Sequence, residues 1–216
     1  ANTKARNIDI LTYSAGGTVG SEGLALLGRI STAEARNLRL GEIYHAAPDA
    51  DLRGFVDDLR DYSKVARRTT IALNMSDSAL RLSEVVNRGS RAGRPNMAEL
   101  SNNQLRFLMD ATANHGVEIL RVRPEKIAAM SSTSHAFWYD DPWVSSDVLA
   151  TFLFHLPPAE RGLTAGRTGD GKTYWTFPRD YDARLPGVIE SLRPRVAAPA
   201  EKAPAEKAPV ATKESA

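Results

Sequence analysis

The sequence predicts an α/β protein in which a parallel β-sheet carries helices on both faces. Two observations indicate this class. Short apolar runs typical of buried strands recur at residues 8–13, 42–47, 69–73 and 117–122. Helix-like segments stand between them, and this alternation indicates βαβ units whose neighbouring strands run parallel. The carboxyl ends of these strands should therefore open on one side of the sheet.

Four helices are predicted, and each follows one of the predicted strands. The clearest is the second, in which apolar residues recur at helical spacing. A Gly-Gly pair precedes the first helix, and Ser76 or Asp77 stands near the start of the third. The predicted helices cover residues 18–27, 50–64, 76–88 and 147–156.

Residues 1–195 are predicted to form one domain, followed by a disordered tail over residues 196–216. The tail repeats an Ala-Pro-Ala-Glu-Lys unit and contains no aromatic residue. Such a segment cannot bury enough apolar area to offset the entropy lost on ordering. A spacer or tether is its expected role.

Composition excludes several classes of function. The net charge of +2 comes from 28 basic and 26 acidic residues in a chain of 216, which is too balanced to indicate nucleic-acid binding. The chain has no cysteine, so disulfides and thiolate chemistry are excluded. It contains no apolar stretch as long as a membrane span and no visible signal peptide. Because the chain begins at Ala1 and its first methionine is Met75, any signal or anchor is expected upstream, and a cytoplasmic or periplasmic location stays open.

The first predicted strand ends at Ser14, on a turn leading into the glycine-rich start of a helix. Such a turn lifts a serine side chain clear of the sheet and aims the N–H of the next residue, Ala15, at a developing oxyanion. Acidic residues follow the next two strands, as Asp49 and as Asp77, and His135 follows the fourth. A serine, an acid and a histidine can therefore converge in that chain order.

The chemistry needs these residue types. A serine hydroxyl is a poor nucleophile until a histidine within hydrogen-bond reach removes its proton. A carboxylate on the other imidazole nitrogen fixes the tautomer and stabilises the imidazolium. No two histidines have metal-ligand spacing, so neither a metal nor a cofactor is predicted.

Three stretches resemble a bacterial family of α/β-hydrolases of unknown function that is described as esterase- or lipase-like. They are ILTYSAGGTVG; IYHAAPDADLRGF with TTIALNMSDSALRLSEVVNRGSRAG; and SHAFWYDDPWVSSDVLATFL. The resemblance runs from about residue 7 to about residue 175 and covers the C-terminal half of that fold. It implies that Ser14 is the nucleophile, Asp77 the acid and His135 the base. It also implies that the N-terminal half of the fold is missing from this chain.

The chain departs from the family pattern around the serine turn. Thr12 occupies the position two residues before the serine, where glycine is usual, and Thr12-Tyr13 replaces a common Ala-His pair. His45 is unusual within a predicted strand. The absent upstream half should hold the earlier strands and the loop that gives a second oxyanion donor.

Several candidate residues have an alternative role. Asp77 can instead cap the helix that follows it, and Asp49 is the alternative acid, although a Pro-Asp turn also explains it. Trp138 and Tyr139 can wall an acyl pocket or simply pack the histidine loop.

The segment GRTGDGKT at residues 166–173 matches the phosphate-loop pattern but is interpreted as a hairpin turn. A phosphate loop needs a buried strand before it and a helix after it. Here Pro157-Pro158 precedes the segment and the strand-like YWTF follows it. Asp-Gly between short β-prone segments is typical of a hairpin.

Two functional hypotheses follow. The first is a serine hydrolase that acts on small carboxylic esters through a Ser-His-Asp triad and an acyl-enzyme. The second is an incomplete or non-catalytic hydrolase-like module. In that case residues 8–13 form an exposed, apolar sheet edge, which is a template for pairing. The missing half, another chain or a second copy is then the expected partner.

Overall fold

Six strands form one mixed sheet in the computed structural model, in the order β1-β2-β3-β4-β6-β5. The structure describes residues 5–30, 38–127, 130–169 and 172–197. Neighbours from β1 to β6 run parallel, and only the β5–β6 pair is antiparallel. The strands are β1 (Ile8–Tyr13), β2 (Leu40–Ala46), β3 (Arg68–Leu73), β4 (Val117–Arg121), β5 (Thr164–Arg167) and β6 (Thr173–Thr176).

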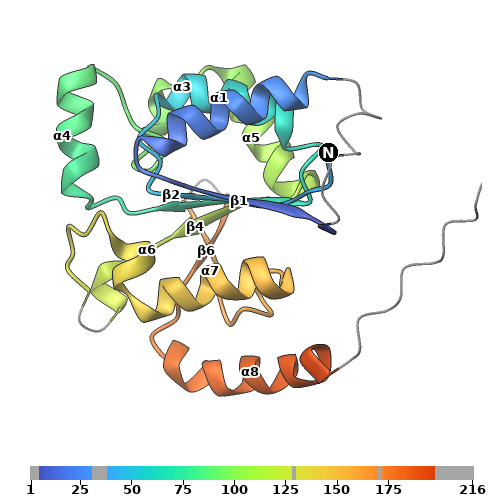
Figure 1. The fold of residues 1–216 in the computed structure, drawn as a ribbon. Helices are drawn as coiled ribbons and strands as arrows, with labels where there is room; N and C mark the ends of the chain where they lie inside the picture. Colours follow the sequence, from blue (N-terminus) through green and yellow to red (C-terminus); the bar gives the residue numbers. More distant parts are fainter. Residues whose placement is uncertain (1–4, 31–37, 128–129, 170–171, 198–216) are drawn as a thin grey trace, which may run out of the picture.

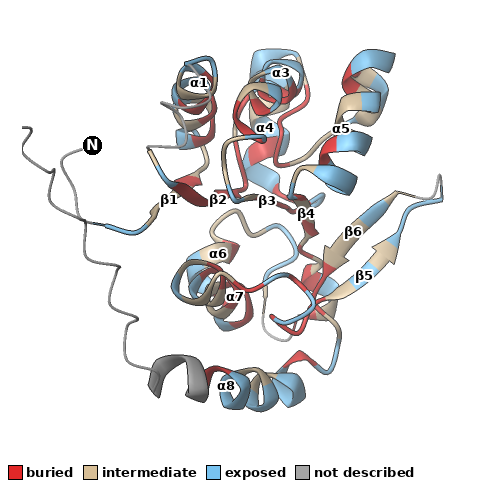
Figure 2. Cartoon of the chain, turned by 90° about the vertical axis from the view of Figure 1, so that its right-hand side faces the viewer, coloured by how far each residue is buried: buried red, intermediate tan, exposed pale blue. Residues whose placement is uncertain are grey.

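Helices cover both faces of this sheet, as Figures 1 and 2 show. One face carries α1 (Gly16–Gly28), α3 (Leu52–Tyr62), α4 (Ser78–Asn87) and α5 (Asn102–Asn114). The other carries α6 (Phe137–Asp140), α7 (Pro142–Phe154) and α8 (Tyr181–Ala197). Short 3-10 turns lie at Met97–Glu99 and Pro124–Lys126. The predicted α/β class, with a parallel sheet covered on both faces, is confirmed.

Strand β2, which lies between β1 and β3, is buried along its whole length. Its side chains alternate between two apolar clusters, one on each face of the sheet. Ile43 packs with Phe55 and Leu59 beneath α3, whereas Tyr44 packs with Val144 of α7. A strand covered on both faces needs apolar or fully hydrogen-bonded residues at nearly every position, which explains the run seen in the sequence.

The predicted elements agree with the structure except in three helices and one start. The four predicted strands lie within two residues of β1 to β4, and GRTGDGKT joins β5 to β6 as the predicted hairpin, with residues 170–171 outside the described part. Helices α5, α6 and α8 were not predicted. Helix α7 begins five residues earlier than expected because Asp141 caps it, accepting from the N–H groups of Trp143 and Val144.

The predicted tail, residues 196–216, overlaps the end of α8 by two residues, because that helix runs to Ala197. Residues 198–216 lie outside the described part of the chain. The domain limit at residue 195 stays a prediction. Among the described residues, no helix has both the length and the apolar character needed to cross a membrane. Strand β1 lies at one edge of the described sheet, and the absence of an N-terminal half also stays a prediction.

Candidate active site

Ser14 stands on the turn between β1 and α1 in a left-handed backbone conformation, with φ of 51°. This region is uncommon for a residue with a side chain and stores strain. Three backbone hydrogen bonds hold the turn: the Ser14 N–H donates to the Ala46 carbonyl, and the Ser14 carbonyl accepts from the N–H groups of Gly17 and Asp49. A Cβ on Gly17 would lie 2.7 Å from the Pro48 Cβ, so glycine is needed for this close approach.

His135 connects Ser14 to Asp77. Its Nε2 lies 2.8 Å from the Ser14 Oγ, and its Nδ1 lies 2.7 Å from the Asp77 Oδ2. An ionised carboxylate can only accept a hydrogen bond, so Nδ1 carries the proton and Nε2 of the neutral ring accepts from the serine hydroxyl. The structure thus brings together the serine, the acid and the histidine that the sequence singled out.

Asp77 uses its two carboxylate oxygens for different partners. While Oδ2 faces His135, Oδ1 accepts from the Leu80 N–H at 3.0 Å and caps α4. The side chain is fully buried. The cap fixes the carboxylate that faces the imidazole, so capping does not exclude the catalytic role, which stays a prediction.

Asn74 anchors the loop that carries His135, a role that sequence reasoning did not assign. Its buried amide donates to the Ser134 carbonyl at 2.8 Å, and its Oδ1 accepts from the Ser76 N–H at 3.0 Å. One side chain thereby connects the loop after β3 with the histidine loop. The available signal was an uncharged polar residue directly after the apolar run of β3.

An aromatic group stands beside the histidine. The Tyr13 ring centroid lies 5.1 Å from that of His135, 5.9 Å from Trp138 and 5.8 Å from Tyr139. Burial, and then the hydrogen bond with Tyr139, raises the pKa of Tyr13 to about 12. Tyr13 is therefore neutral at ordinary pH, and its ring lies beside that of His135. The sequence identified Trp138 and Tyr139 as possible wall residues, which stays a prediction, and did not single out Tyr13.

Ala15 caps α1 with helical backbone angles and is exposed. The first N–H groups of a helix lack intrahelical partners and carry partial positive charge. A Cβ on Gly16 would meet no heavy atom within 4 Å. The start of α1 therefore offers both space and backbone donors beside Ser14.

Asp49, the alternative acid, is engaged elsewhere. Its Oδ1 accepts from the Arg91 Nε at 2.5 Å and from the Ser83 hydroxyl at 2.7 Å. Its backbone supports the serine turn, because the N–H donates to the Ser14 carbonyl and the carbonyl accepts from the Thr18 hydroxyl. The structure places Asp49 as a support of the turn, and none of its hydrogen bonds goes to His135.

Thr12 and His45, which are unusual at their positions, belong to one buried network of hydrogen bonds. The Thr12 Oγ1 lies 2.7 Å from the His45 Nδ1, and the His45 Nε2 lies 2.9 Å from the Tyr62 hydroxyl. Burial lowers the pKa of His45 to about 3, so the imidazole is neutral. On the other side, the Thr12 methyl group fills the space left by Gly20 of α1. Among the described residues, no cluster of three or more His, Asp or Glu side chains suits a metal ion.

The sheet, the strained serine turn and the carboxyl-end loops define the architecture of the α/β-hydrolase class. Comparison of the sequence with known families identifies a match over residues 1–148 to the family described as alpha/beta hydrolase of unknown function (DUF900). The chain belongs to this family. The same kind of comparison finds neither a curated protein nor a solved structure that matches this chain.

Proposed function

We propose that this protein is a serine hydrolase that cleaves small carboxylic esters through Ser14, His135 and Asp77. The observation that carries the proposal is the position of the His135 ring, with Nε2 at 2.8 Å from the Ser14 Oγ and Nδ1 at 2.7 Å from the Asp77 Oδ2. These distances are within the range in which a base can take the proton of its nucleophile.

The reaction has two halves. In the first, the Ser14 Oγ attacks the acyl carbon while His135 takes the hydroxyl proton, and His135 then gives this proton to the departing alcohol. In the second, His135 takes a proton from the water that attacks the acyl carbon, and gives it to the Ser14 Oγ as the bond between Oγ and the acyl carbon breaks and the carboxylic acid leaves. The buried Asp77 holds the ring in the required tautomer and stabilises the imidazolium.

The oxyanion of each tetrahedral intermediate would bind the N–H of Ala15 at the start of α1. This donor follows the nucleophile directly, as in other strand–turn–helix serine sites. A preorganised backbone donor of this kind typically contributes about 10²–10³ in rate. Tyr13, Trp138 and Tyr139 would form an apolar wall for the acyl or alcohol group. The choice of esters over amides or thioesters rests on family resemblance.

A fluorophosphonate probe tests this proposal on the 216-residue chain. We expect covalent labelling that maps to Ser14, is lost in Ser14→Ala and in His135→Ala, and persists in Ser131→Ala. Ser131 is a matched control because it lies exposed in the histidine loop. The proposal fails if the folded wild-type chain is not labelled, or if Ser14→Ala is labelled as strongly.

A second candidate is a non-catalytic module that binds through the β1 edge. Strand β1 has a strand neighbour on one side only in the described sheet, and unpaired edges are templates for strand addition. Exposed apolar side chains lie on the helices of both faces, namely Val19 and Leu26 of α1 and Leu149 and Leu153 of α7.

Sedimentation over a range of concentrations separates the two candidates. If the protein is a binding module, it should self-associate or bind an added chain that supplies the missing half of the fold. This association should weaken in the double variant Val19→Lys/Leu26→Lys, and the probe should not label Ser14. A monomer that the probe labels at Ser14 contradicts the binding-module candidate.

A further inference from the structure

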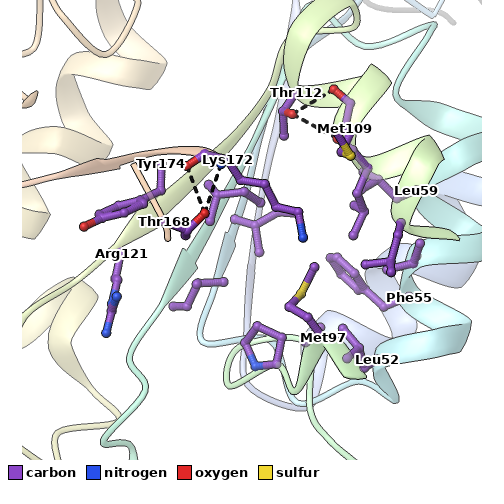
Figure 3. A pocket seen from close by; sticks show the side chains of 18 of the residues that line it. Leu52, Phe55, Leu59, Met97, Met109, Thr112, Arg121, Thr168, Lys172 and Tyr174 are labelled. Atoms are coloured by element: carbon purple, nitrogen blue, oxygen red, sulfur yellow. Dashed lines mark hydrogen bonds between the residues drawn. The ribbon is translucent and has the colours of Figure 1, made fainter. Parts of the chain in front are cut away.

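A cavity of about 270 Å³ lies on the α3–α5 face of the sheet. Helices α3 and α5 form one side, β3 and β4 the floor, and the β5–β6 hairpin the opposite side (Figure 3). Ser14, Asp77 and His135 do not line it. Its volume is near the lower end of the range for small-molecule sites, about 300–1,000 Å³.

The lining is apolar over most of its extent. Phe55 and Leu59 come from α3, Leu108 from α5, and Ile71 and Ile119 from the sheet. An alkyl chain packed against these side chains would be stabilised because its apolar surface is removed from water. The cavity is too small for a helix, whose diameter with side chains is about 10 Å.

The charged side chains of this lining are Arg121 and Lys172, and no carboxylate is among the lining residues. In Figure 3 the Lys172 side chain extends from the hairpin toward Phe55 and Met97. Arg121 lies at the margin, with its guanidinium carbon 5.8 Å from the centre of the Tyr174 ring. An apolar cavity whose described lining residues include two cations and no carboxylate is complementary to a molecule with one alkyl chain and one anionic head.

We propose that this cavity binds a monomeric long-chain carboxylate, with its head group on Lys172 and Arg121 and its alkyl chain between α3 and α5. The ammonium and the guanidinium donate to the carboxylate oxygens, and such charge-assisted bonds are about twice as strong as neutral ones. This inference is independent of the chemistry proposed for Ser14, because the two sites share no residue.

Calorimetric titration of the 216-residue chain with dodecanoate, below its micelle concentration, tests the proposal. Dodecanol and dodecyltrimethylammonium serve as neutral and cationic ligands of the same chain length. We expect dodecanoate to bind most tightly and dodecyltrimethylammonium most weakly. Lys172→Met should weaken dodecanoate about tenfold, as expected when one charge-assisted hydrogen bond is lost, and leave dodecanol nearly unchanged.

Blocking variants separate this cavity from other apolar surfaces. Leu108→Trp should abolish binding of all three ligands. Thr112→Trp, at the exposed rim, should have the same effect and is the second blocking variant in case Leu108→Trp fails to fold. Leu153→Trp, at an exposed apolar position on α7, is the matched control and should bind as the wild type does.

The proposal is overturned if dodecanoate does not bind, if both folded blocking variants still bind it, or if the cationic ligand binds equally well. Two other occupants are also distinguished. Binding to anionic vesicles without binding to monomeric dodecanoate would indicate a membrane surface. A dimer that Thr112→Trp disrupts, without dodecanoate binding, would indicate a second copy. Either result contradicts the proposed ligand.

Discussion

Asp77 combines a structural and a proposed chemical role, and the two can be separated by substitution. Asn keeps an oxygen for the Leu80 N–H but replaces the carboxylate that faces His135. We expect Asp77→Asn to lower ester hydrolysis by about 10⁴, because the imidazole loses its fixed tautomer, with unfolding free energy little changed. Asp77→Ala should lose the same activity and also about 1 kcal/mol of stability with the cap. Steady-state hydrolysis and urea unfolding measure both, and full activity in Asp77→Asn would exclude the triad role.

His45 makes stability depend on pH. Its pKa is lowered to about 3 by burial, against about 6.5 in the unfolded chain. Above pH 6.5 the His45 imidazole is neutral in both the folded and the unfolded chain, so its contribution to stability is fully present. Between about pH 6.5 and pH 3 only the unfolded chain binds the proton. The unfolding free energy therefore decreases as the pH is lowered, by up to about 1.4 kcal/mol per pH unit. Unfolding by guanidinium at pH 7, 6 and 5 should show a shallower decline for His45→Gln. Equal declines would mean that His45 is protonated in the folded state.

The contact between α1 and β1 depends on a matched pair of residues. A Cβ on Gly20 would lie 2.4 Å from the Thr12 Cγ2. We expect Gly20→Ala to cost about 1–3 kcal/mol through overpacking. Adding Thr12→Ser removes the methyl group but keeps the hydroxyl bonded to His45, so the double variant should be more stable than the sum of the single changes. Thermal unfolding measures each value.

Gly23 is the matched control on the same helix, since nothing lies within 4 Å of the position of its Cβ. Gly23→Ala should be neutral or stabilising by up to about 1 kcal/mol. Strictly additive effects of the Gly20 and Thr12 changes would contradict the proposed steric coupling. The pair also explains how the chain accommodates Thr12 two residues before the serine: Gly20 on the facing helix has no side chain and leaves space for the Thr12 methyl group.

Helix α5 was missed although its sequence carries signals of a helix. Only Gln104 and Ala111 are fully buried, and the partly buried Phe107 and Leu108 pack against the core. Its start was nevertheless marked, because Ser101 and Gln104 form a capping box. The strands β2 and β3 were predictable because burial on both faces leaves continuous apolar runs.

At the scale of the whole molecule, a buried ionic cluster connects the α7 layer to the sheet. Arg161 is fully buried; its Nη2 lies 2.9 Å from the Glu118 Oε2 of β4, and its Nε lies 3.2 Å from the Asp147 Oδ1 of α7. We expect Arg161→Met to destabilise the protein by about 3–5 kcal/mol, because it leaves the buried Asp147 carboxylate without its cation, whereas Glu118 keeps its ion pair with Arg68. Guanidinium unfolding measures the loss.

The triple variant Arg161→Met/Asp147→Asn/Glu118→Gln removes the charges together and should recover part of that stability. Arg184→Met serves as the control, since its ion pair with Asp180 is exposed and should contribute at most about 1 kcal/mol. If Arg161→Met changes stability no more than Arg184→Met, the cluster does not hold the layers together. No charge pattern in the sequence signalled this cluster, because its members are distant along the chain.

The sequence by itself determined the α/β class, the four parallel strands, the hairpin and the chain order of Ser14, Asp77 and His135. These follow from local patterns: apolar periodicity, turn residues and polar side chains at strand ends. Only the tertiary structure decided that Asp49 pairs with Arg91, that Asn74 anchors the histidine loop and that Tyr13 stacks on His135. It also decided that a cavity with two cations lies on the α3–α5 face. Such contacts join residues far apart in the chain, and they depend on the register and packing of elements that local sequence does not specify.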